Sequence, residues 1–130
     1  MEPQAKILII DDNPDFLFTT ETLLRRHGFA TLTAENGRKG LDLVKEKMPD
    51  LVLLDIMMET LLSGFEVCRQ IKSDPELKHI PVIGISGMGA ETGVHFDKEK
   101  DAEYFQPDDF FEKPVEREKL LAKIEALLKR

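Results

Sequence analysis

Three carboxylates lie where two apolar stretches of this chain end. Asp11 and Asp12 follow the aliphatic stretch 7–10, and Asp55 follows the aliphatic stretch 51–54. Such a stretch is typical of a strand that is buried on both faces of a parallel sheet. Neighbouring carboxylates at about 4 Å repel one another by about 4 kcal/mol per pair at an effective dielectric constant of about 20, so a cation must offset them. A few carboxylates with water molecules suit Mg²⁺.

Two further strand ends supply a hydroxyl and an ammonium group. Ser86 ends the apolar stretch 80–86, and Lys113 follows the short stretch 109–112. A carboxylate can attack phosphorus while a divalent cation and an ammonium group neutralise the oxygens of a loose transition state. Together with the three carboxylates, these residue types predict a phosphoryl-transfer site.

The elements that would hold these residues alternate along the chain. Asn13 and Pro14 suit the start of a helix, and Gly28 suits its end. The apolar spacing predicts strands at 5–11, 29–35, 50–55, 80–86 and 109–112, and helices at 14–27, 38–47, 64–72 and 116–129. Residues 87–107, which are first glycine-rich and then polar and acidic, show neither pattern.

Alternating strands and helices form right-handed βαβ units and a parallel sheet that is covered on both faces. Five strands in 130 residues fit a flavodoxin-like, doubly wound α/β sheet, since a closed barrel needs about 250 residues. The usual order 2-1-3-4-5 makes the first and third strands neighbours. Asp11, Asp12 and Asp55 would then share one crevice. We expect a single domain over residues 1–130.

Composition narrows the expected partners. With 18 basic and 25 acidic residues, the net charge is 18 − 25 = −7, which disfavours direct binding to nucleic acid or to an anionic membrane. The single cysteine, Cys68, cannot form an internal disulfide, which fits a reducing compartment. No stretch approaches the roughly 18 apolar residues of a membrane helix, and the N-terminus does not have the pattern of a signal peptide. We expect a cytoplasmic protein.

Five motifs, in order, resemble the receiver domain of bacterial response regulators of the chemotaxis-regulator type. The resemblance covers essentially the whole chain, and it is specific because each motif stands at its proper strand or helix end. The motifs are Asp11-Asp12, Asp55-Ile56-Met57-Met58, Ser63-Gly64-Phe65-Glu66-Val67, Ile80-Pro81-Val82-Ile83 with Ser86, and Phe111-Glu112-Lys113-Pro114. The resemblance implies a two-component signalling module that takes a phosphoryl group from a sensor histidine kinase or phosphotransfer domain and acts on an unidentified output partner.

The resemblance also implies a phosphoacceptor and a metal site. Asp55 would take the phosphoryl group from a phosphohistidine. Asp12, Asp55 and the backbone carbonyl of Met57 would hold Mg²⁺, with Asp11 acting through water. The module would catalyse only its own phosphorylation and dephosphorylation, so it would not be an enzyme acting on other substrates.

Three more residues receive roles in the switch by resemblance. Lys113 would pair with Asp55 and then with the phosphoryl oxygens. Ser86 would move to form a hydrogen bond with the phosphoryl group, and Phe110 would occupy the aromatic position that follows this movement. The switch would be an electrostatic event that changes a distant face.

Two alternatives remain for the function. A Mg²⁺-dependent phosphatase with an aspartyl nucleophile would need an acidic residue two positions after Asp55, where Met57 stands, and a substrate cap, for which no segment remains. A degenerate receiver would bind partners without phosphorylation, although this chain has all the site residues of the family pattern.

The chain departs from the family pattern in three places. The loop after Asp55 is slightly longer and has Glu59 where proline is usual, and the interval 87–107, where the family has its fourth helix, is also longer. Met57 and Met88 are bulky, and we expect them to hinder the attacking water and prolong the phosphorylated state. Replacing Met57 with asparagine should then speed the loss of phosphate.

Overall fold

The computed structural model describes residues 4–56, 63–86, 108–113 and 115–129. The strands are β1 (Lys6–Ile10), β2 (Ala30–Ala34), β3 (Leu51–Asp55), β4 (Val82–Ser86) and β5 (Asp109–Glu112), and the helices are α1 (Pro14–Arg26), α2 (Gly37–Lys47), α3 (Ser63–Ser73) and α5 (Arg117–Leu128). All strand pairs are parallel and their order is β2-β1-β3-β4-β5, so the predicted doubly wound sheet is confirmed. The predicted element bounds differ from these by only a few residues at each end.

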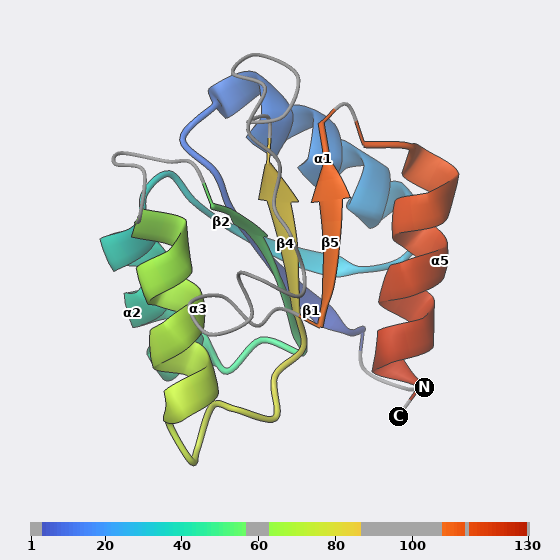
Figure 1. The fold of residues 1–130 in the computed structure, drawn as a ribbon. Helices are drawn as coiled ribbons and strands as arrows, with labels where there is room; N and C mark the ends of the chain where they lie inside the picture. The colour runs from blue at the N-terminus through green and yellow to red at the C-terminus, as the bar shows by residue number, and fades with distance from the viewer. Residues whose placement is uncertain (1–3, 57–62, 87–107, 114, 130) are drawn as a thin grey trace.

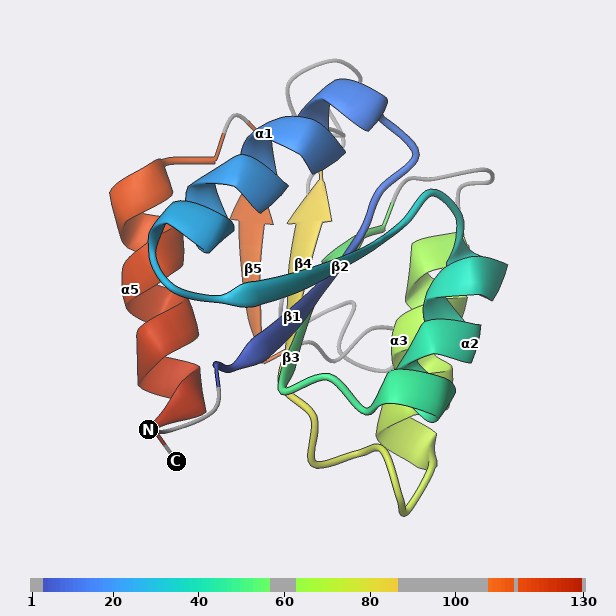
Figure 2. The ribbon, with the colours of Figure 1, turned by 180° about the vertical axis from the view of Figure 1, so that it is seen from behind.

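The sheet separates two hydrophobic cores, because side chains alternate between its faces along each strand. In β1, Leu8 and Ile10 belong to the core under α2 and α3, whereas Ile7 and Ile9 belong to the core under α1 and α5. All four side chains are fully buried. The two helix pairs on opposite faces are seen in Figures 1 and 2. Burial on both faces explains why the central strands are continuous aliphatic stretches.

The first helix begins and ends as its sequence predicts. The Asn13 side chain accepts hydrogen bonds from two backbone amides of the first turn, and Pro14 occupies the first turn. Gly28 follows the helix with φ of 89°, a left-handed conformation that favours glycine. Leu24 is fully buried, whereas Phe18 points outward and is 72% exposed.

One lysine connects the end of α3 with the starts of β4 and β5. Lys72 Nζ donates to the carbonyl oxygens of Ile80 at 2.8 Å and Lys78 at 3.3 Å, and lies 2.7 Å from Asp108 Oδ2. The same carboxylate oxygen accepts from the Val82 amide at 2.7 Å. The Asp108 amide in turn donates to the Val82 carbonyl oxygen at 2.7 Å. These contacts fix β4 and β5 together at the amino edge of the sheet.

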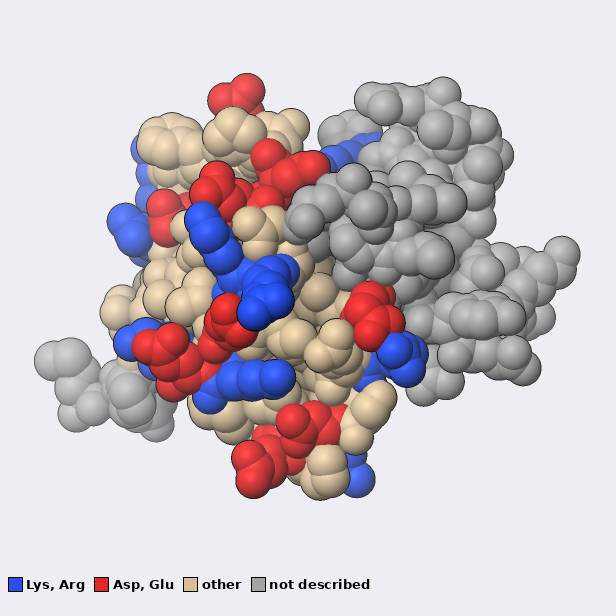
Figure 3. Space-filling model, turned by 90° about the vertical axis from the view of Figure 1, so that its left-hand side faces the viewer, with Lys and Arg blue, Asp and Glu red and all other residues tan. Residues whose placement is uncertain are grey.

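Charged side chains of both signs are interspersed on the face that α2 and α3 form (Figure 3). On α3, Arg69 lies 2.7 Å from Glu66, and its hydrogen bonds hold the pKa of the Glu66 carboxyl below its usual value. Within the part of the chain that the structure describes, we find no helix with the length and apolar character needed to span a bilayer. The fourth helix of the family pattern falls in 87–107, outside the described residues.

Candidate functional site

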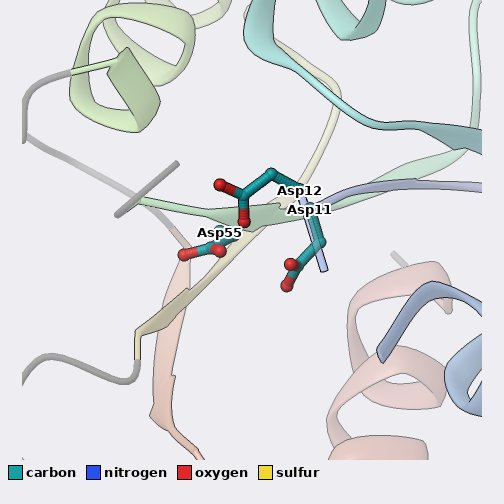
Figure 4. Close-up of side chains that lie close together, drawn as sticks. All are labelled: Asp11, Asp12 and Asp55. Atoms are coloured by element: carbon teal, nitrogen blue, oxygen red, sulfur yellow. The ribbon is translucent and has the colours of Figure 1, made fainter. Parts of the chain in front are cut away.

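The side chains of Asp11, Asp12 and Asp55 gather at the carboxyl ends of β1 and β3 (Figure 4). The register pairs Ile10 with Leu54, so the next residues, Asp11 and Asp55, lie side by side at the carboxyl ends of the two strands. One carboxylate oxygen from each of the three lies within 4.8 Å of the others. The predicted convergence of these carboxylates at the ends of two neighbouring strands is confirmed.

The three carboxylates have different environments. Asp11 is fully buried and Asp55 is 5% exposed, whereas Asp12 is exposed. Asp11 Oδ1 accepts a hydrogen bond from the Asn13 amide at 2.8 Å, which fixes the orientation of this carboxylate. Asp11 Oδ2 is different, since no donor among the described residues makes a hydrogen bond to it. A buried carboxylate oxygen without a hydrogen bond is costly unless a cation compensates it.

Lys113 supplies a positive charge directly beside these carboxylates. Its Nζ atom lies 2.9 Å from Asp11 Oδ2, as an ionic contact rather than a hydrogen bond, and 3.7 Å from Asp55 Oδ2. The predicted pairing of Lys113 with Asp55 is present, but the ammonium group lies closer to Asp11. The net charge of the three carboxylates and one ammonium group is −2, which leaves the cluster suited to a divalent cation with oxygen ligands.

Sequence reasoning missed one contact in this cluster. Lys113 Nζ lies over the ring of Phe16, 4.4 Å from its centroid. The Phe16 side chain also packs against the core under α1 and α5. A signal was nevertheless present, because Phe16 comes one helical turn after Asp12 on the helix that leaves the site.

The close approach of α3 to the end of β3 depends on Gly64. A Cβ atom at this position would lie 2.6 Å from the carbonyl oxygen of Asp55 and would clash with Cα of Ile56. Glycine therefore lets the first turn of α3 lie against the backbone beside Asp55. The sequence motif contained Gly64, but its packing role emerges only from the structure.

Ser86 and Phe110 have the expected places in the sheet. Ser86 ends β4 and pairs in register with Glu112, the residue before Lys113, so its backbone stands at the same edge as the cluster. Phe110 is half-buried against the core under α2 and α3, whereas Phe111 packs against the opposite core. Met57 and Met88, and with them the predicted carbonyl ligand, lie outside the described residues, as does the Ser86 side chain.

Known proteins resemble this chain over most of its length. The model of the response regulator receiver domain matches residues 7–125. The protein PilH of Pseudomonas aeruginosa is 40% identical over 124 residues, which are 95% of this chain and 98% of PilH. The transcriptional regulatory protein AfsQ1 of Streptomyces coelicolor is 36% identical over 95% of this chain, which spans only 51% of AfsQ1.

A solved structure confirms the fold independently. The receiver domain of the sensor histidine kinase PA1611 of Pseudomonas aeruginosa superposes with a TM-score of 0.82 at 19% identity, over 98% of this chain and 100% of that domain. That domain was solved with a magnesium ion coordinated in its active site cleft. At this level of identity the comparison supports the fold alone.

Proposed function

This chain belongs to the response regulator receiver domain family of two-component signalling, and on that premise we propose that Asp55 accepts a phosphoryl group from a phosphohistidine. The observation that supports Asp55 most directly is its position. Its nearly buried carboxylate ends a central strand, within 4.8 Å of two other carboxylates and 3.7 Å from Lys113 Nζ.

The proposed reaction forms one bond and breaks another. An Asp55 carboxylate oxygen attacks phosphorus, and the bond from phosphorus to the donor imidazole nitrogen breaks. Lys113 would then leave Asp11 and neutralise the oxygens of the transferred group. In dephosphorylation, a separate step, water attacks phosphorus, the bond from phosphorus to the Asp55 oxygen breaks, and inorganic phosphate and the free carboxylate result. Both steps belong to the module itself, which we propose is not an enzyme acting on other substrates.

Receiver domains bind Mg²⁺ at an acidic pocket, and the three carboxylates of this chain fit that ion. We assign Asp12, Asp55 and the carbonyl of Met57 to direct coordination, and Asp11 to contact through water. Asp12 is exposed, and it can reach the ion without losing a partner among the described residues, whereas Asp11 already faces Lys113. Bound there, Mg²⁺ would neutralise charge on the phosphoryl oxygens.

The proposal extends to the switch and the partners. Ser86 would form a hydrogen bond with the phosphoryl group and Phe110 would follow that movement. Receiver domains interact with histidine kinases or phosphotransfer domains, and we propose such a donor for this single domain over residues 1–130, in the cytoplasm. The output partner is unassigned, and the net charge of −7 argues against nucleic acid as a direct partner.

Titration with beryllofluoride, a phosphoryl mimic, tests this function. We expect saturable binding that requires Mg²⁺, lost in Asp55→Asn and kept in Asp42→Asn, which removes an exposed carboxylate from α2. Steady hydrolysis of an added phosphate ester would instead indicate the phosphatase. No binding by the wild-type protein would indicate the degenerate receiver, and either result would contradict the proposal.

A further inference from the structure

Among the described residues, three groups lie beside the Lys113 ammonium group, and two of them, the carboxylates, compete for it. Asp11 Oδ2 lies at 2.9 Å and Asp55 Oδ2 at 3.7 Å, while the ring of Phe16 lies 4.4 Å away at its centroid. The lysine side chain is 24% exposed, and its four-carbon stem has several rotamers. Restricting such a chain to one orientation costs conformational entropy, so a contact that restricts it changes how often the ammonium group faces the carboxylates.

The backbone of Phe16 is connected to the carboxylate cluster through Asn13. Its backbone amide donates to Asn13 Oδ1 at 3.3 Å, and the Asn13 amide donates to Asp11 Oδ1 at 2.8 Å. The ring also packs against the core under α1 and α5. Consecutive contacts therefore connect Asp11 to Asn13, Asn13 to Phe16, Phe16 to Lys113, and Lys113 back to Asp11.

We propose that Phe16 is a positioning residue for phosphorylation, whose ring face keeps the Lys113 ammonium group between Asp11 and Asp55. The attraction is electrostatic, because the face of an aromatic ring carries negative charge and the ammonium group lies within about 6 Å of the centroid. The ring cannot accept the proton or bind phosphate, so it leaves the ammonium group available to the phosphoryl oxygens. This inference rests on the proposed function, since the reaction that benefits is the one proposed at Asp55.

Two substitutions at position 16 separate charge from shape. Phe16→Leu removes the ring and keeps the apolar packing. Incorporation of 3,4,5-trifluorophenylalanine keeps the ring and withdraws charge from its face. Phe29→Leu is the matched control, because Phe29 is a half-buried phenylalanine of the same core. We expect both changes at Phe16, but not the control, to weaken Mg²⁺-dependent beryllofluoride binding about three- to tenfold.

An NMR order parameter for the Lys113 side chain gives a readout that does not depend on phosphoryl chemistry. Its signal is assigned by its absence from Lys113→Arg. The order parameter should fall in both Phe16 variants and stay at the wild-type value in Phe29→Leu. The proposal requires that both Phe16 variants lose Lys113 order and beryllofluoride affinity together. A variant that loses only one of the two overturns it. If the wild-type protein binds no beryllofluoride, the proposed function fails, and the order parameter alone then decides whether Phe16 positions Lys113.

Discussion

At the scale of residues, the three aspartates of the cluster are not equivalent. Asp11 has no exposed surface, a hydrogen bond that orients one oxygen and an ionic contact of 2.9 Å at the other. Asp12 is exposed. In the absence of metal, the charge of Asp11 is therefore compensated inside the protein, whereas the charge of Asp12 chiefly adds repulsion that water screens.

Neutralising these two aspartates should change stability in opposite directions. In EDTA, Asp12→Asn should raise the free energy of unfolding by less than about 1 kcal/mol, because the removed repulsion is largely screened. Asp11→Asn should lower it by about 1–3 kcal/mol, because Lys113 loses its nearer partner. Urea denaturation measures both changes. A lower urea midpoint for Asp12→Asn, or an unchanged midpoint for Asp11→Asn, would contradict this account.

At the scale of elements, the site depends on how closely a helix can approach a strand. The first turn of α3 lies against the end of β3 because Gly64 has no side chain. Protein interiors are close-packed, so an added methyl group at this position would require a shift of the backbone. The position of the Asp55 backbone is thus fixed partly by a glycine that adds no side chain to the carboxylate cluster.

Gly64→Ala should disturb both stability and the site. We expect a loss of about 1–3 kcal/mol in the free energy of unfolding, as is typical of overpacking, and weaker beryllofluoride binding, because the backbone beside Asp55 must move. Gly28→Ala is the comparison. Its positive φ of 89° makes alanine strained, but a Cβ atom there would meet nothing within 4 Å. That variant should lose stability and keep its affinity. Equal losses of affinity in the two variants would rule out a local effect at Gly64.

The elements that the sequence predicted well are those with strong local signals. Aliphatic stretches identified the central strands, and Asn13, Pro14 and Gly28 identified the ends of α1. The expected strand order 2-1-3-4-5 predicted the meeting of Asp11, Asp12 and Asp55, because neighbouring parallel strands bring their carboxyl ends to one edge. The Phe16 contact was missed because it depends on the rotamer of a long lysine side chain from a distant strand end. The approach at Gly64 was missed because packing distances leave no local pattern.

At the scale of the whole molecule, the chain has a net charge of −7 and concentrates three of its carboxylates at one edge of the sheet. A divalent cation that binds there only in the folded state must stabilise the fold by mass action. The gain is about 2.7 kcal/mol at a free concentration 100 times the dissociation constant. Non-specific screening of the net charge by salt would also stabilise the fold. Only the effect of the bound cation requires the three carboxylates.

Magnesium should therefore raise the melting temperature of the wild-type protein in proportion to the logarithm of its concentration above the dissociation constant. Calorimetry in MgCl₂, with NaCl at matched ionic strength as the control, measures this shift. Asp12→Asn should lose most of the magnesium shift and keep the small response to NaCl. An equal rise with both salts in the wild-type protein would mean that screening, rather than site binding, stabilises the fold.

The contacts of Lys72 have a consequence for protein engineering. The connection from β4 to β5 departs at Ser86 and returns at Asp108, and the returning end is anchored by Lys72 and Val82. The register of β5 against β4 is therefore anchored before the first residue of β5. An engineered exchange of the preceding interval that keeps Asp108 should retain this register.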